Sequence, residues 1–176
     1  LSLLDSKTEV SAISNLSYSD YAYLTCRGGW PRMINLPKEQ SLKIANAYAK
    51  ELCNKDISNY DNVNRNSQLA WDILKAYSRQ VSTINTDKSL FNDVRNLSGD
   101  VSDNTIRNYI EVFKNLHVID EIPAWNPNIR SKTAITSSSK KTLVDPSIAT
   151  AVLNCTPKEL QLDPETFGLL FENLCT

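Results

Sequence analysis

The string "CRGGWPR" sets two adjacent glycines between Arg27 and Arg32, the residue types that surround phosphate groups in many proteins. A P-loop requires G-x-x-x-x-G-K-[ST] between a strand and a helix, and a dinucleotide-binding turn requires three spaced glycines. Neither pattern occurs in this sequence, which contains four glycines in all. We therefore predict that Gly28 and Gly29 form a conformational hinge with Trp30 docked in a core. Arg27 and Arg32 are retained as candidates that reach a nucleotide from outside.

A second candidate site is a helix-turn-helix with a basic wing. Residues 89–125 predict a short helix, a turn at Gly99, an N-cap at Ser102 and a longer helix, followed by the strand-like string "HVIDEIPAW". The string "KKTLVD" is the expected partner strand, and together these elements make a winged-helix arrangement. In such proteins the second helix enters the DNA major groove. Here that helix is nearly neutral; its polar positions are Asp103, Asn104, Arg107, Asn108 and Glu111.

The wing itself is basic, because residues 128–141 contain cations and no acidic residue. Two readings follow. Either the module binds DNA by placing its cations on the phosphate backbone, or it is a structural or protein-docking winged helix. The DNA-binding candidates are Arg107, Arg130, Lys132, Lys140 and Lys141.

No group of residues predicts an enzyme or a metal centre. The carboxylates are scattered along the chain, and His117 is the only histidine. Zinc sites need four clustered ligands, whereas the four cysteines lie far apart without C-x-x-C spacing. We expect reduced thiols in a cytoplasmic protein, no catalytic residue, no metal and no cofactor on this chain. With a net charge of −1, no overall field attracts nucleic acid or anionic lipid, and no apolar run approaches the roughly 20 residues that span a bilayer.

Helical periodicity covers most of the sequence, so we predict a mainly α fold with a small β-hairpin. The predicted organisation is a helical bundle over residues 1–88, a winged-helix-like unit over 89–145 and trailing helices over 146–176. Pro146 and Pro164 are each suited to a first helical turn. The final string "FGLLFENLCT" shows no stop signal, so we expect a segment of a longer protein whose apolar ends form a homodimer.

Four separated strings carry a family resemblance: "RGGWPR", "DVSDNTIRNYIEVFKNLHVIDEIPAWNPNIRSK", "LVDPSIATAVL" and "TFGLLFENL". In this order they resemble the bacterial and archaeal AAA-type ATP-binding proteins that end in a C-terminal domain of unknown function. That family has an N-terminal P-loop ATPase domain, a winged-helix-like middle region and a C-terminal domain similar to the PD-(D/E)XK nucleases.

The resemblance implies that this chain is the middle segment. Glu172 then matches the first acidic position of the nuclease-like domain, while the Walker motifs and the later nuclease positions are absent. The implied partners are the ATPase and C-terminal domains, with ATP and Mg bound by the parent. The implied function is a linker and interaction module between those domains, with DNA binding as the alternative.

Overall fold

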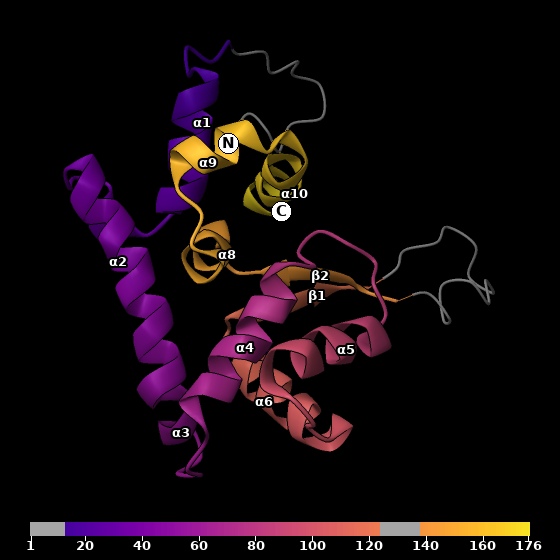
Figure 1. Cartoon of the computed structure of the whole chain (residues 1–176). Helices are drawn as coiled ribbons and strands as arrows, with labels where there is room; N and C mark the ends of the chain where they lie inside the picture. Colours follow the sequence, from indigo (N-terminus) through magenta and orange to yellow (C-terminus); the bar gives the residue numbers. More distant parts are fainter. Residues whose placement is uncertain (1–12, 124–137) are drawn as a thin grey trace, which may run out of the picture.

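Helices make up most of the computed structural model, which describes residues 13–123 and 138–176, and two short strands form one antiparallel sheet (Figure 1). The predicted mainly α class with a small β-hairpin is therefore confirmed. Within these two ranges, no helix combines the length and the apolar character that a membrane crossing requires.

The elements are short, and most of them begin and end at the polar residues, glycines or prolines expected to bound them. In chain order they are α1 (Tyr18–Arg27), the 3-10 turn η2 (Pro31–Met33), α2 (Lys38–Glu51), the π-helical segment η3 (Leu52–Asp56), α3 (Ile57–Asn59), α4 (Ser67–Ser78), α5 (Asp87–Ser98), α6 (Asp103–Asn115), β1 (Ile119–Ile122), β2 (Lys140–Leu143), α8 (Pro146–Leu153), α9 (Pro157–Leu162) and α10 (Pro164–Cys175).

Helices α4, α5 and α6 each begin at a side chain that accepts hydrogen bonds from the first-turn N–H groups. Asn66 caps α4, Thr86 caps α5 and Ser102 caps α6. Gly99 ends α5 at a φ of 79° and turns the chain toward α6. The sequence offers Asn64 or Asn66 as the cap of α4, and the structure has Asn66; the predicted cap Ser102 and the predicted turn at Gly99 are confirmed.

The hairpin pairs Ile122 with Lys140 next to its loop and Ile119 with Leu143 at its open end. A further segment lies along the free edge of β2. Ser82 donates its N–H to Lys141 O at 2.8 Å, and Lys141 donates its N–H to Thr83 O at 3.2 Å. The connection between α4 and α5 therefore lies along β2, on the side opposite to β1.

Helix α10 is fixed to the same edge of β2 by the side chain of Asn173. Its Oδ1 accepts from Leu143 N–H at 3.0 Å, and its Nδ2 donates to Leu143 O at 2.7 Å. A second bond runs from Ser82 Oγ to Leu169 O at 2.8 Å. The carboxamide thus occupies both backbone groups of one strand residue, as a neighbouring strand would.

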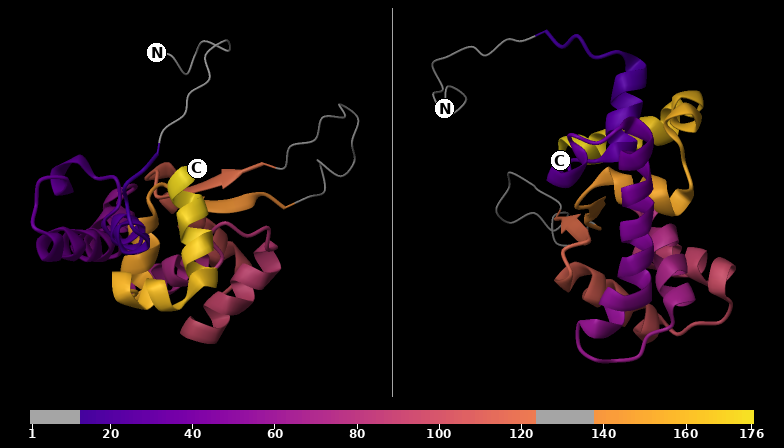
Figure 2. Two further views of the ribbon diagram at one scale, coloured as in Figure 1. Left: turned by 90° about the horizontal axis from the view of Figure 1, so that it is seen from above. Right: turned by 90° about the vertical axis from the view of Figure 1, so that its left-hand side faces the viewer.

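Helix α8 lies at the centre of the molecule, where it packs against α1, α2, α4 and α10 (Figures 1 and 2). Pro146 stands in its first turn, as predicted, and Asp145 caps it. The long helix α2 covers one side of α8, while α1, α9 and α10 gather at one end (Figure 2). A single cluster of buried apolar side chains joins these elements to α4, α5 and α6; it includes Ile73, Leu90, Phe113, Ile148 and Leu170 and extends across the predicted boundaries near 88 and 145.

Helix α2 does not end the helical segment at Glu51. Beyond Glu51 the chain passes through the π-helical segment η3 and continues to Asn59. A π-helical turn holds more residues than an α-helical turn, so it shifts the apolar stripe around the axis. The result is that Leu52, Cys53 and Ile57 are all buried.

Candidate functional site

The two glycines predicted to be a hinge form a tight contact with Asp145. Gly28 ends α1 at a φ of 77° and donates its N–H to Leu24 O at 2.8 Å. Gly29 donates its N–H to Asp145 Oδ2 at 2.7 Å. A Cβ atom on Gly28 would lie 2.2 Å from Asp145 Oδ1, so both the backbone angle and the carboxylate exclude a side chain there.

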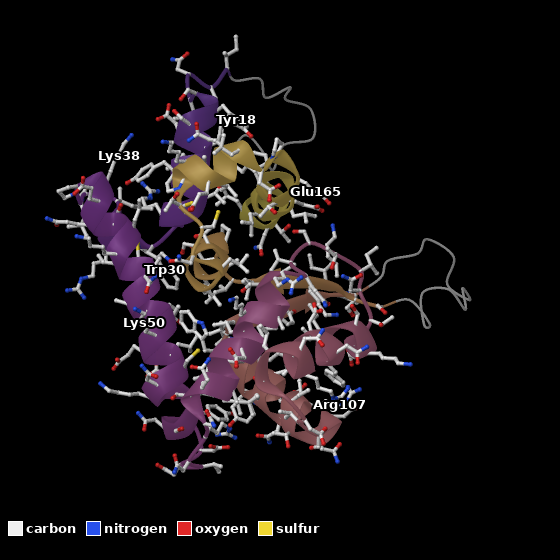
Figure 3. All side chains as sticks on the ribbon, in the orientation of Figure 1. Tyr18, Trp30, Lys38, Lys50, Arg107 and Glu165 are labelled. Atoms are coloured by element: carbon white, nitrogen blue, oxygen red, sulfur yellow. The ribbon has the colours of Figure 1, made fainter. Side chains whose placement is uncertain are left out.

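Trp30 completes this contact from the same loop. Its Nε1 donates to Ser147 Oγ at 2.9 Å, while Asp145 Oδ1 accepts from Ser147 N–H at 2.8 Å. The indole ring lies 4.8 Å from the ring of Tyr48 between α2 and α8 (Figure 3). We call Gly28, Gly29, Trp30, Asp145 and Ser147 the Gly–Asp clasp. Because both carboxylate oxygens of Asp145 accept backbone N–H groups, the clasp holds two segments together.

The two arginines beside the clasp face different surroundings. Arg27 is half-buried, and its Nε donates to Gly28 O at 3.0 Å. Arg32 lies in η2 and is exposed. The clasp therefore fixes the backbone around both residues, and their approach to a nucleotide stays a prediction.

The two wing lysines in β2 have opposite surroundings. Lys141 is 2% exposed, and its Nζ donates to Asn85 O at 2.6 Å. Lys140 points to the other face and forms an ion pair with Glu172 of α10. Glu172, the residue that the resemblance matches to a nuclease-like acidic position, is thus engaged by a lysine of the hairpin. Neither ammonium group is a free cation on the surface.

Arg107 is also paired. Its NH1 lies 2.8 Å from Asp87 Oδ2, and its guanidinium stands 4.8 Å from the centroid of the Phe91 ring. Arg130 and Lys132, the other two predicted DNA contacts, lie outside the described residues. The exposed residues of α6 include one cation and two carboxylates; they are Asp103, Asn104, Arg107, Asn108, Glu111 and Asn115.

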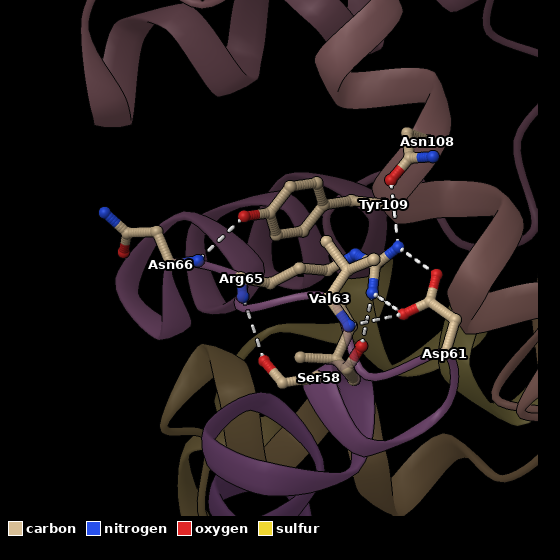
Figure 4. A network of polar contacts seen from close by, with 8 residues as sticks. Ser58, Asp61, Val63, Arg65, Asn66, Asn108 and Tyr109 are labelled. Carbon is tan, nitrogen blue, oxygen red and sulfur yellow. Dashed lines mark hydrogen bonds and ion pairs between the residues drawn. The ribbon is translucent and has the colours of Figure 1, made fainter.

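A buried arginine at the junction of α3 and α6 was not anticipated from the sequence (Figure 4). The side chain of Arg65 is 3% exposed; NH1 donates to Ile57 O at 2.8 Å and to Asp61 Oδ1 at 2.5 Å, and NH2 donates to Asp61 Oδ2 at 2.7 Å. NH2 also reaches Asn108 Oδ1 at 3.1 Å, which ties the turn to α6. Among the described residues, Arg65 Nε has no hydrogen-bond partner.

The same junction is strengthened by Tyr109, whose hydroxyl accepts from Asn66 N–H at 2.9 Å. The guanidinium of Arg65 bonds the carboxylate of Asp61 and lowers the pKa of Asp61 to about 2. The i, i+4 spacing of Asp61 and Arg65 was the available signal, but it lies in a polar turn where such a pair is normally solvated.

A hollow of about 630 Å³ adjoins the hairpin and includes His117, Asp120 and Glu121 in its lining. His117 ends α6 at a φ of 55°, and the following Val118 donates its N–H to Phe113 O at 2.9 Å. These bonds close the helix end, so the unusual backbone angle has a structural cause. In the described part of the chain, no hydrogen bond joins the imidazole to a hydroxyl or carboxylate.

The cysteines are free thiols in the structure. Burial raises the pKa of Cys26 and of Cys53 to about 12, so both are protonated at neutral pH. Across the described ranges, no group of three or more histidine, cysteine, aspartate or glutamate side chains is placed to hold a metal ion.

The comparisons with known proteins give one result. A family model described as "Domain of unknown function (DUF8612)" matches residues 18–159, which extend from the start of α1 into α9. This range contains the whole Gly–Asp clasp and the whole Arg65 junction. No curated protein and no solved structure matches the chain significantly.

Proposed function

We propose that this chain is a linker and interaction module without catalytic activity of its own. The chain belongs to the family described as "Domain of unknown function (DUF8612)", and the proposal concerns what this domain does. The observation that carries this proposal is the Gly–Asp clasp, which joins residues 116 apart in sequence through backbone and side-chain bonds. Such a contact couples the positions of two segments, because each oxygen of the carboxylate accepts a backbone N–H group from a different one of them. The resemblance to AAA-type ATP-binding proteins supplies the parent: ATP and Mg are bound by the parent's ATPase domain, in the cytoplasm.

Part of the proposed module is a winged helix formed by α4, α5, α6 and the hairpin. The order of these elements supports it, and so does the pairing of Ser82 and Thr83 with Lys141. In a winged helix the connection between the first two helices lies beside the strand that closes the hairpin. Here the backbone of residues 82–83 occupies that place.

The proposed coupling route starts at α1 and passes through the clasp to α8. From α8 the route passes back to β2, which directly precedes this helix in the chain, and then to α10 through the bonds between Leu143 and Asn173. A movement of α1 imposed by a neighbouring ATPase domain would act directly on Asp145 and the start of α8. Coupling through such contacts requires two alternative arrangements, and the clasp, open or closed, is the proposed two-state element.

Protein docking is favoured over DNA binding because each described DNA-contact candidate is either buried or already paired with a carboxylate. Lys141 is buried, Lys140 is paired with Glu172 and Arg107 with Asp87. A phosphate contact would have to displace these partners. DNA binding therefore remains the second proposal, carried by Arg130 and Lys132 in a stretch without acidic residues.

The experiment that tests the leading proposal is to sequence the gene on both sides of this segment. A G-x-x-x-x-G-K-[ST] motif upstream, between a strand and a helix, supports a module of an AAA-type ATP-binding protein. Flanking sequence without any nucleotide-binding motif would refute it. On the chain itself, millimolar ATP with Mg should leave the melting temperature unchanged, since only a ligand that binds the native state raises it.

DNA binding is tested separately with a duplex and a salt titration. If Arg130 and Lys132 neutralise phosphates, the slope of log K against log salt falls by about 0.9 for each of them that is changed to Ala. The variants of choice are Arg130→Ala and Lys132→Ala, because Lys141→Ala removes a buried residue and would confound binding with stability. Identical slopes for wild type and variants, or no binding at all, would exclude DNA as the partner.

A further inference from the structure

An exposed aromatic groove lies between α1 and α10, away from the clasp. It has a volume of about 300 Å³ and is lined by Tyr18, Tyr21, Pro164, Phe167, Gly168 and Phe171. Tyr18 meets Phe167 edge to face at 5.0 Å, and Tyr21 meets Phe171 in the same way at 5.6 Å. Tyr18 remains 51% exposed and Phe171 38% exposed. The rings thus hold one another in place while leaving apolar surface in water.

Gly168 forms the gap in the middle of this groove. It lies inside the 12-residue helix α10, where glycine is unfavourable by roughly 1 kcal/mol relative to alanine. Nothing lies within 4 Å of the position that a Cβ would take, so no neighbour in the described chain forces this position to be a glycine. A glycine on an exposed helix face permits close approach of another backbone or of an inserted side chain.

The charges around the groove indicate what approaches. Glu165 lies one turn before Gly168 and Glu172 one turn after it, on the same face of α10. Figure 3 shows Glu165 of α10 and Tyr18 of α1 at the same end of the molecule. Residues 157–175 contain four acidic side chains and one lysine, Lys158. A second copy crossing antiparallel at Gly168 would set Glu165 against Glu172, which is repulsive.

We propose that this groove docks an amphipathic helix that places an apolar side chain over Gly168 and lysine or arginine residues beside Glu165 and Glu172. This inference rests on the proposed function as an interaction module and names the chemistry of a partner. A helix in a groove is a common recognition mode in which a few apolar anchors supply affinity and flanking charges supply orientation. Glu172 also binds Lys140, so a basic partner competes with the hairpin for this carboxylate.

The test uses the whole chain and a synthetic helical peptide of about 14 residues, roughly four turns, with leucines three and four apart and lysines one turn from the central leucine. The comparison peptide replaces those lysines with glutamates. Calorimetry or fluorescence anisotropy should detect the basic peptide, with affinity falling as salt rises, and should detect the acidic peptide weakly or not at all.

Two variants locate the binding. Gly168→Trp fills the groove from an open position and should weaken binding by about tenfold or more, the effect of losing a central anchor pocket. Glu165→Lys should weaken it by about threefold, as expected for an exposed charge pair. The control is Tyr60→Ala, which removes another exposed aromatic ring and should leave affinity unchanged. Tyr60 directly follows α3, which Figure 1 shows at the opposite end of the structure from α1 and α10.

Other outcomes overturn the proposal. Equal binding of the basic and acidic peptides, or unchanged affinity in Gly168→Trp, would show that the groove does not select a basic helix. A concentration-dependent dimer that Gly168→Trp abolishes, measured by light scattering, would show that a second copy occupies it. Peptide binding does not depend on the sequence that flanks this segment. If that sequence refutes the AAA-type parent, a positive peptide result still stands. If the peptide does not bind, the assignment of the parent is unaffected.

Discussion

The N–H of Gly29 donates a 2.7 Å hydrogen bond to the carboxylate of Asp145, which stands at the first turn of α8. The same carboxylate caps that helix through Ser147 N–H. One side chain therefore sets both the start of a central helix and the end of α1. Loss of this contact should uncouple the end of α1 from the start of α8, while Ala22 and Cys26 keep α1 packed in the core.

Gly28→Ala should destabilise the fold more than a matched substitution elsewhere. Gly28 and Gly99 both end a helix at a positive φ, of 77° and 79°, a region nearly restricted to glycine and costing other residues about 1–3 kcal/mol. At Gly99 nothing lies within 4 Å of the added Cβ, whereas at Gly28 the carboxylate of Asp145 does. Urea unfolding of Gly28→Ala and Gly99→Ala then separates the cost of the clash from that of the backbone. Equal losses in the two variants would mean that the clasp readily yields.

Trp30 and Ser147 should show a coupling energy of about 0.5–1.5 kcal/mol, the usual net value of one hydrogen bond. The measurement is a double-mutant cycle of Trp30→Phe, Ser147→Ala and the double variant, which separates the bond from the packing of the ring against Tyr48. Additive effects of the two changes would show that Trp30 contributes through the packing of its ring and not through its N–H bond to Ser147.

The Asp61–Arg65 pair should make stability depend on pH in the acid range. Hydrogen bonding to Arg65 lowers the pKa of Asp61 from 3.8 to about 2. Because the pKa of Asp61 is lower in the folded than in the unfolded protein, its ionised form stabilises the fold. This stabilisation is complete when the pH is above the pKa of the unfolded state, and it is lost as the pH falls to the pKa of the folded state. The urea midpoint of the wild type should therefore fall between about pH 4 and pH 2, and part of that fall should be missing in Asp61→Asn. Parallel profiles for wild type and variant would contradict this assignment.

His117→Gly should stabilise the protein by up to about 1 kcal/mol. Glycine relieves the roughly 1–2 kcal/mol cost of the left-handed backbone angle of 55°, and its more flexible unfolded chain offsets about 0.4–1 kcal/mol of that gain. The control is Asn154→Gly at the end of α8, where φ is 57° but asparagine tolerates the left-handed region, so the gain should be smaller. Thermal unfolding measures both. A loss of stability in His117→Gly would indicate that the imidazole makes a contact worth more than the relieved strain.

Local signals predicted many of the element boundaries. Ser102, and either Asn64 or Asn66, are predictable as caps because their short polar side chains precede apolar residues at helical spacing. Gly28, Gly99 and the prolines at 146 and 164 also stand where backbone geometry requires them. The two strands followed from alternation and from the loop between them. These features depend on a few neighbouring residues, which is why one sequence suffices.

The site could not be predicted to the same extent, because its contacts are distant in sequence. Nothing near Gly29 indicates Asp145, and nothing near Arg65 indicates Asn108. Lys140 and Lys141 were taken together as wing cations, but adjacent residues in a strand point to opposite faces, so one of them had to turn inward. Alternation alone would have separated them. The π-helical segment after Glu51 has no recognisable sequence signal.

The bond pair between Asn173 and Leu143 also bears on self-association. A short strand with free N–H and C=O groups is a template on which other chains add strands and grow into fibrils. In β2 the outward groups of Lys141 are taken by residues 82–83, and those of Leu143 by the Asn173 carboxamide, which is 5% exposed. Replacing that one carboxamide would uncover a strand edge and turn a folded hairpin into a seed for aggregation.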